Sequence, residues 1–206
     1  MKTNYQLLLD GKIKEIESSG VRPSLLLHAC CAPCSSYVLE YLSKYFRITL
    51  FFYNPNISQR KEYDVRYEEL QRLVAEMGLD GKVIFTDSEY EPERFFEIAK
   101  GLEDLPEGGE RCKKCYTLRL EATAKVAAAK GFDLFTTTLS ISPHKNATWL
   151  NEIGKEMAHR YGSEYLFSDF KKRGGYLRSC QLSEQYGLYR QNFCGCIYSK
   201  LQREKS

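Results

Sequence analysis

Short apolar runs alternate with helical segments along most of the chain. The apolar runs predict strands at residues 24–28, 47–53, 82–86, 134–138 and 164–168. The segments between them predict helices at residues 35–45, 58–77, 92–100, 115–130 and 148–161. Residues 101–110, rich in glycine and acids, predict an exposed loop, and the tail after the last strand is irregular with short helical segments.

The helix at residues 58–77 shows the pattern most clearly. Its apolar side chains follow one another at intervals of four, three, four and three positions, which places them on one face: Tyr63, Tyr67, Leu70, Val74 and Met77. Strands that alternate with helices indicate an α/β fold with a mainly parallel sheet flanked by helices. No repeat or linker divides the chain, so we expect residues 1–206 to form a single domain that ends in a basic, cysteine-containing segment from about residue 170.

In a parallel sheet, ligands bind at the carboxyl ends of the strands. Residues suited to catalysis or ligand binding follow every predicted strand: His28 and Cys30, residues 54–56, Asp87, residues 140–146, and Asp169. The sequence therefore predicts a single active site at this edge of the sheet.

The composition limits the class of protein to which this chain can belong. The 206 residues are 43% hydrophobic and 28% charged, as in a soluble globular domain, and the longest apolar runs are far too short to cross a bilayer. The first residues lack the apolar core of a signal peptide, so we expect a cytoplasmic protein without membrane contact. The net charge is only +3, but the segment from Lys171 onward holds eight cations and two acids, which suggests an anionic partner.

Eight cysteines are the most informative feature of the composition, and seven of them fall in three clusters. In a reducing compartment, clustered cysteines indicate metal ligands or redox thiols and not structural disulfides. Cys180 stands alone, and we interpret it as a small apolar residue without a special role.

The first two clusters offer five soft ligands. Cys30, Cys31 and Cys34 lie at a predicted helix N-terminus, which favours thiolate, in a loop without the glycine that suits a phosphate site. Cys112 and Cys115 form a C-x-x-C motif flanked by cations. Such a set suits an iron–sulfur cluster, with a structural zinc site as the alternative. A thioredoxin-like dithiol of Cys31 and Cys34 is a further alternative, but it leaves the other thiols unexplained.

The third cluster is Cys194-Gly195-Cys196. A C-x-C pair can close a small, strained disulfide, and such a bond is readily reduced, which suits a catalytic redox couple. On spacing alone, a role for one or both cysteines as additional metal ligands is about equally favoured.

Polar residues after the last two strands are further candidates. Asp169 suits a metal ligand or a proton shuttle, although an aspartate at this position is more often a cap or turn residue. The loop after the fourth strand is dense in hydrogen-bond donors, and its Ser142, His144 and Lys145 suit a phosphate or a ribose. The alternative is an ordinary polar loop in which Asn146 caps the next helix.

The basic tail interleaves cations with aromatic rings, as recognition of single-stranded RNA requires. Its candidate binding residues are Lys171, Lys172 and Arg190, and a solvated basic face is the alternative. His28 either orients the cysteine loop or is a buried residue that forms hydrogen bonds.

Together these residues resemble the QueH-type epoxyqueuosine reductases. The matching motifs run in the family's order and cover most of the chain from residue 24 to 199. They are His28-Ala-Cys-Cys-Ala-Pro-Cys34, Arg111-Cys-Lys-Lys-Cys-Tyr116 with Arg119, Thr137-Thr-Leu-Ser-Ile-Ser-Pro143, Asp169-Phe-Lys-Lys172 and Tyr189-Arg-Gln-Asn-Phe-Cys-Gly-Cys196.

The resemblance implies an oxidoreductase that carries out the last step of queuosine synthesis, in which epoxyqueuosine at the tRNA anticodon wobble position loses its epoxide oxygen. It implies a [4Fe-4S] cluster held by N-terminal and central cysteines, a second, mononuclear iron near it, and no cobalamin. It also implies an adenine-nucleotide hydrolase-like (HUP-type) fold in which cysteines replace the phosphate loop. An external electron donor is required.

On this resemblance we expect the cluster on Cys30, Cys31, Cys112 and Cys115, whereas spacing by itself favours Cys31 and Cys34 in the first segment. The remaining thiol, Cys34 in our assignment, is then free to bind the second metal with Asp169. Cys194 and Cys196 would supply a two-electron couple. The alternative function is a zinc-stabilised tRNA-binding or tRNA-thiolating protein of the same fold, and it predicts a colourless protein.

Overall fold

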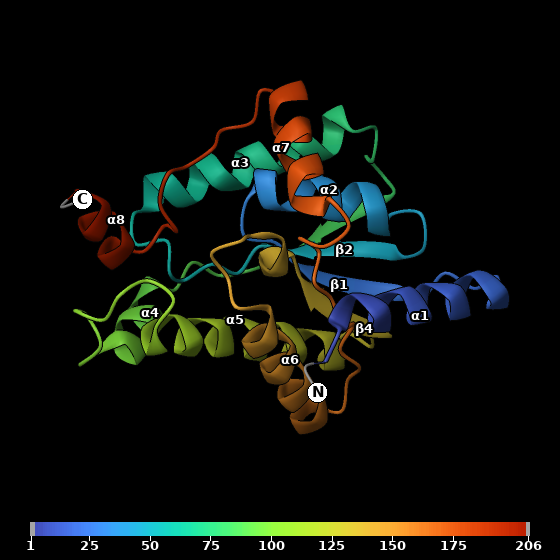
Figure 1. Ribbon diagram of the computed structural model, residues 1–206, viewed down its shortest axis with the longest axis horizontal. Helices are drawn as coiled ribbons and strands as arrows, with labels where there is room; N and C mark the ends of the chain where they lie inside the picture. Colours follow the sequence, from blue (N-terminus) through green and yellow to red (C-terminus); the bar gives the residue numbers. More distant parts are fainter. Residues whose placement is uncertain (1–2, 205–206) are drawn as a thin grey trace.

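The computed structural model describes residues 3–204 and contains a parallel four-stranded sheet at its centre (Figure 1). The strands are β1 (Ser24–His28), β2 (Arg47–Phe51), β3 (Val83–Thr86) and β4 (Leu134–Thr137), in the order β3-β2-β1-β4. In the inner strand β1, Leu26 lies beside Thr49 of β2 and Phe135 of β4. The predicted α/β fold with a mainly parallel sheet is confirmed, and none of the described helices is long and apolar enough to span a membrane.

Helices cover both faces of the sheet. Apolar side chains of α1 (Tyr5–Ser19), α2 (Ala32–Leu42) and α3 (Arg60–Glu76) form one core, and those of α5 (Glu110–Ala129) and α6 (Ala147–Tyr161) form a second. Figure 1 shows α2 and α3 above the sheet and α5 and α6 below it. The remaining helices are α4 (Pro92–Ala99), the short 3-10 helix η1 (Thr138–Ile141), α7 (Gly175–Gln185) and α8 (Ile197–Glu204).

The order of the strands places a crevice beside β1. The chain leaves β1 toward β2 on one side, and β4 joins β1 on the other, so the connections diverge at the carboxyl ends of these two strands. Ligands of open α/β sheets bind at such a switch point. The cysteine loop follows β1 here, and η1 follows β4.

The prediction of a fifth strand at residues 164–168 is wrong in extent. Only Tyr165 forms a bridge, with Phe135, and two backbone hydrogen bonds flank it, from Phe135 N to Glu164 O and from Leu166 N to Phe135 O. Farther along, the amide of Asn151 on α6 binds both the N–H and the C=O of Ser168. Because a helix side chain satisfies this backbone, the strand ladder does not continue.

Four helical segments differ from the sequence predictions. Helix α2 spans Ala32–Leu42 and not residues 35–45, three positions earlier than predicted at both ends. Helix α1 was not predicted, although Asn4 caps its first turn and Gly20 ends it in the left-handed region. Helix α5 begins at Glu110 and not at residue 115, because its first turn hydrogen-bonds back to Gly109. The tail is more ordered than predicted: α7 packs against α2, and α8 follows near the C-terminus (Figure 1).

Candidate metal and redox site

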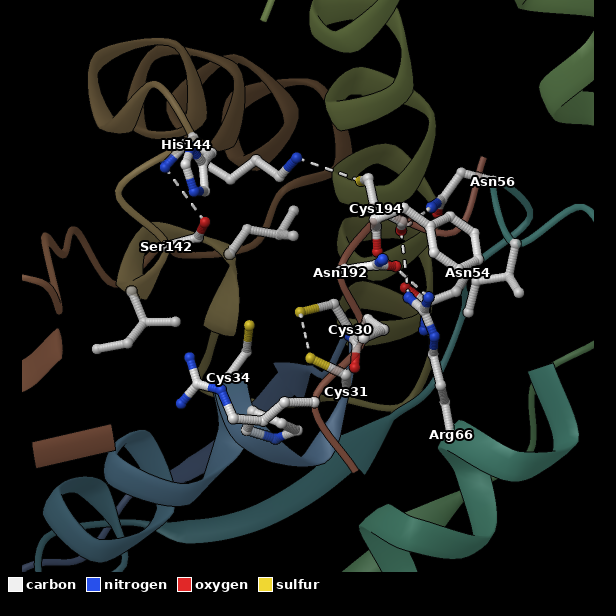
Figure 2. Close-up of a pocket in the computed structure, with 18 of the residues that line it drawn as sticks. Cys30, Cys31, Cys34, Asn54, Asn56, Arg66, Ser142, His144, Asn192 and Cys194 are labelled. Atoms are coloured by element: carbon white, nitrogen blue, oxygen red, sulfur yellow. Dashed lines mark hydrogen bonds between the residues drawn. The ribbon is translucent and has the colours of Figure 1, made fainter. Parts of the chain in front are cut away.

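Three thiols gather where β1 passes into α2. The sulfur atoms of Cys30, Cys31 and Cys34 lie within 4.8 Å of one another, and those of Cys30 and Cys31 are 3.8 Å apart (Figure 2). Cys31 is the N-cap residue of α2, whose first turn also contains Pro33. Hydrogen bonds from the Cys30 and Cys34 thiols, helped by the charge of Arg66, hold the pKa of Cys31 well below its usual range. This group can therefore bind a soft metal.

The backbone of this loop is held from both neighbouring strands. Asn54, after β2, donates its amide N–H to the Ala29 carbonyl at 2.9 Å, and the Thr138 hydroxyl accepts from the Cys30 N–H at 3.3 Å. His28 is fully buried between Thr137 Oγ1 and the carbonyl of Tyr53. Burial lowers the pKa of His28 to about 4, so the imidazole is neutral and acts as a structural hydrogen-bonding group.

The other two cysteine clusters meet each other at a small cavity. Cys112 and Cys115, in the first turns of α5, line it together with Cys194 and Cys196. Burial raises the pKa of Cys115 to about 11 and that of Cys196 to about 12. All eight cysteines are unpaired thiols in this structure.

The small cavity adjoins a larger one of about 280 Å³, which contains the Cys30, Cys31 and Cys34 group. Five residues line both cavities: Asn56, Glu107, Arg119, Lys145 and Cys194. The three cysteine clusters thus converge near the carboxyl ends of β1 and β4, where the strand-end pattern predicts the active site. Among residues 3–204, the potential metal ligands whose ligand atoms lie within 4.8 Å of one another are the three N-terminal thiols. Cys112 and Cys115 are not part of this group.

The Cys194-Gly195-Cys196 segment is held tightly by its neighbours. Arg66 and Asn56 both donate to the Cys194 carbonyl, at 3.2 and 3.3 Å, and the Gly195 carbonyl accepts from a backbone N–H (Figure 2). Gly195 has a φ of 104°, and a Cβ there would lie 3.0 Å from atoms of Arg66 and Ile57. The segment therefore requires glycine between its cysteines.

Buried cations surround the thiols. Arg66 pairs with Glu62 at 2.7 Å, and Lys145 pairs with Glu107 at 3.1 Å. Arg119 is only 1% exposed; its Nη1 donates to Asn54, whereas Nε and Nη2 have no hydrogen-bond partner within residues 3–204. The site thus holds a buried guanidinium without a carboxylate partner, a feature expected where a negatively charged group binds.

The predicted substrate-binding residues divide into two sets. Ser142, His144, Lys145 and Arg190 line the larger cavity, and Ser142 and His144 are seen at its edge in Figure 2. Lys171 and Lys172 are not among its lining residues.

Asp169 does not join the thiol group. Its carboxylate accepts from Lys171 Nζ at 2.7 Å, and its carbonyl accepts from the Lys172 N–H, as in a turn. The set of ligand-type side chains found around Cys34 in residues 3–204 consists of cysteines alone. The alternative prediction for Asn146 is confirmed, since its side chain caps α6 by accepting from the Trp149 N–H.

Sequence reasoning missed Arg66 and Glu107 as site residues, and it named Arg119 only as part of a motif of the resemblance, without a role. Arg119 lies four positions after Cys115 on α5, and this spacing places the two side chains on the same helix face. That interval is the signal by which the sequence could have placed Arg119 beside the C-x-x-C motif.

Comparisons with known proteins agree on one family. The family model described as epoxyqueuosine reductase QueH matches residues 25–202. The chain is 44% identical over 200 residues to epoxyqueuosine reductase QueH of Streptococcus pyogenes serotype M1, covering 96% of this chain and 78% of that protein. It is 41% identical to the protein of that name from Staphylococcus epidermidis (98% and 87% covered) and 36% identical to that of Thermotoga maritima (88% and 93% covered).

Proposed function

This chain belongs to the epoxyqueuosine reductase QueH family, and on that premise we propose that it reduces epoxyqueuosine in tRNA to queuosine. Its relatives are named as reductases, and the reaction we propose is the removal of the epoxide oxygen at the anticodon wobble position. One observation supports this most: seven cysteines from three distant segments line two adjoining cavities at a single edge of the sheet.

The reaction requires two electrons and two protons. Both C–O bonds of the epoxide break, a carbon–carbon double bond forms, and the oxygen leaves as water. Conversion of the Cys194 and Cys196 thiols to a disulfide releases two electrons and two protons, which matches this requirement. Both side chains line the same cavity, and Cys194 also faces the larger one.

The donor set fits an iron–sulfur cluster. Thiolates are the usual ligands of such clusters, and we assign Cys30, Cys31, Cys112 and Cys115 to a [4Fe-4S] cluster. The buried, carboxylate-free guanidinium of Arg119 supports this assignment, because a thiolate-bound cluster needs a counter-charge. When bound, iron supplies single electrons and a Lewis acid that polarises the epoxide oxygen.

A second, mononuclear iron remains part of the proposal. Cys34 is then its first ligand, since it is the N-terminal thiol left over from the cluster. For Asp169 to be the other ligand, its carboxylate has to leave the ion pair with Lys171. Binding of this iron thus requires a rearrangement of residues 169–171.

The larger cavity suits a nucleotide that is turned out of an RNA loop. Tyr176 and Arg190 are exposed at its edge, where a ring can stack on a base and a guanidinium can bind a phosphate. Exposed His144 and Arg203 line it as well. These residues support the anticodon loop of tRNA as the partner.

The test is turnover on tRNA that carries epoxyqueuosine. Anaerobically purified protein and an electron donor are incubated with this tRNA, and the digested nucleosides are measured by mass spectrometry. The proposal expects epoxyqueuosine to be replaced by a nucleoside that is lighter by one oxygen atom. Unchanged epoxyqueuosine with a colourless protein that contains stoichiometric zinc would instead support the zinc-stabilised tRNA-binding alternative.

A further inference from the structure

The two cysteines of the C-G-C segment have different surroundings. Cys194 is half-buried and lines both cavities, whereas Cys196 is 6% exposed and lines only the small one. Cys196 packs in an apolar cluster with Phe95 and accepts a hydrogen bond from the Ser199 N–H. Access to a substrate in the larger cavity therefore differs between the two sulfur atoms.

A buried lysine contacts Cys194. Lys145 is 8% exposed, and its ammonium lies 3.2 Å from Cys194 Sγ, the contact drawn as a dashed line in Figure 2. Burial lowers the pKa of Lys145, but the facing Cys194, Tyr116 and Glu107 outweigh it and raise that pKa well above its usual range. The lysine is thus charged beside the sulfur, and an ammonium at this distance stabilises a negatively charged sulfur.

Glu107 connects the lysine to both cysteines. One carboxylate oxygen accepts from Lys145 Nζ at 3.1 Å, and the other accepts from the Ser199 hydroxyl at 3.0 Å. Ser199 in turn binds the Cys194 N–H through its hydroxyl and the Cys196 sulfur through its own N–H. The positions of the ammonium and of the two sulfurs are therefore set by one hydrogen-bond network.

We propose that Lys145 gives the two cysteines different roles. Its ammonium stabilises the negatively charged sulfur of Cys194, which faces the substrate cavity, whereas Cys196 remains the buried, protonated partner. This inference rests on the proposed function and names a proton carrier for it. When the charged Cys194 sulfur and the Cys196 thiol form their S–S bond, they release two electrons and one proton. Lys145 gives the second proton, and both protons leave with the epoxide oxygen as water.

The release of the lysine proton follows from the same contact. Once Cys194 is in a disulfide, its sulfur has lost the negative charge that held the ammonium in place. Burial then favours the neutral amine, while Tyr116 and Glu107 continue to oppose this change. Solvent returns the proton when an external donor reduces the disulfide, so Lys145 is ready for the next cycle.

The test compares the alkylation of the two cysteines in anaerobically purified protein. Neutral iodoacetamide and anionic iodoacetate are added in separate reactions, and modified Cys194 and Cys196 are quantified by peptide mass spectrometry. We expect Cys194 to react faster than Cys196, and Lys145→Met to slow Cys194 on the order of tenfold, because one hydrogen bond to a charged group is lost. The preference of Cys194 for iodoacetate over iodoacetamide should fall in Lys145→Met and return in Lys145→Arg.

Two further variants serve as controls. Lys61→Met removes an exposed cation that does not line the cavity, so it should leave both alkylation rates unchanged. Glu107→Gln keeps the ammonium beside Cys194, so Cys194 should still react faster than Cys196.

Two results overturn the proposal: equal alkylation of Cys194 and Cys196 in the wild-type protein, or an unchanged Cys194 rate in folded Lys145→Met. If Lys145→Met does not fold, the wild-type rates and the Lys145→Arg and Glu107→Gln variants decide. Because alkylation uses no tRNA, its outcome is separable from that of the proposed function. A protein that reduces epoxyqueuosine but shows no difference between the cysteines rejects this inference alone. A protein that shows the difference but leaves epoxyqueuosine unchanged rejects the function alone.

Discussion

Arg119 Nη1 donates a hydrogen bond to Asn54 Oδ1 at 3.3 Å, and Asn54 donates its own amide N–H to the carbonyl of Ala29. These bonds link α5 to the loop that follows β1. Burial lowers the pKa of Arg119, but the nearby sulfurs of Cys115, Cys194 and Cys30 outweigh burial and raise this pKa. Each of these sulfurs belongs to a different cysteine cluster. One buried cation is thus shared by the three segments.

This position predicts the effect of Arg119 on the reduction potential of the proposed iron–sulfur cluster. Reduction adds negative charge, which a nearby cation stabilises, so Arg119→Met should lower the midpoint potential. A tenfold change in the one-electron equilibrium corresponds to about 59 mV, and we expect a shift on this order. Arg119→Lys keeps the charge and should shift less. A redox titration followed by visible absorption measures the midpoint potentials of both variants. Equal midpoint potentials in wild type and Arg119→Met would refute the stabilisation of the reduced cluster by Arg119.

The second prediction separates the cluster from the dithiol. Cys194→Ser removes one sulfur of the proposed redox couple but none of the proposed cluster ligands. We expect the variant to retain its visible absorption and iron content and to lose epoxide reduction. Retained turnover in Cys194→Ser would exclude the dithiol couple while leaving the cluster assignment in place.

The sequence predicted the place of the site better than its details. Residues at the ends of the predicted strands indicated one edge of the sheet, and the clusters at Cys30, Cys112 and Cys194 do meet there. This worked because parallel strands bring their carboxyl ends together whatever the lengths of the connections. The short contact of residues 164–168 with β4 was not predictable, since it depends on Asn151, a side chain of another element.

The cations were the least predictable part. Arg111, Lys113 and Lys114 flank the C-x-x-C motif in sequence, yet Arg111 Nη1 binds three carbonyls of the preceding loop, and Lys113 lies over the ring of Trp149. Lys114 is exposed. Adjacent helix residues point in different directions, whereas Arg119 shares a face with Cys115. Lys145 reaches Cys194 only through the tertiary fold, and local sequence contains no sign of that contact.

A third prediction concerns the glycine between the two cysteines. Gly195→Ala places a Cβ at a φ of 104° and 3.0 Å from Arg66 and Ile57, so it should destabilise the protein and disturb the C-G-C segment. Gly131→Ala is the matched control, because its φ is also positive but nothing lies within 4 Å of the added Cβ. We expect about 1–2 kcal/mol lost in the control, from backbone strain alone, and more in Gly195→Ala. Urea unfolding of the two variants measures this difference, and equal losses would contradict the packing argument.

A fourth prediction concerns the docking of α7, which contributes Tyr176 and Ser179 to the cavity wall. Arg178 on α7 binds the carboxylate of Glu40 on α2, and this hydrogen bond lowers the pKa of Glu40. Because the pKa of Glu40 is lower in the folded than in the unfolded protein, the ion pair stabilises the fold above the unfolded pKa, near 4.5. This stabilisation is lost as the pH falls through the pKa that Glu40 has in the folded protein.

Glu40→Gln should therefore cost at most about 1 kcal/mol at pH 7, because the pair is partly exposed. The same variant should also lose less stability than wild type between pH 5 and about pH 3, as expected when one linked carboxylate is removed. Urea unfolding across this pH range gives both quantities. Parallel pH profiles for the two proteins would show that the ion pair contributes nothing.

The central claim is that thiolates of the first two cysteine clusters hold iron and sulfide at the cavity. The most direct test is the absorption spectrum of anaerobically purified protein, combined with iron, sulfide and zinc analysis. We predict a broad band near ~400 nm that bleaches with dithionite and is lost in a Cys112→Ser, Cys115→Ser double variant. A flat spectrum with stoichiometric zinc would contradict the account.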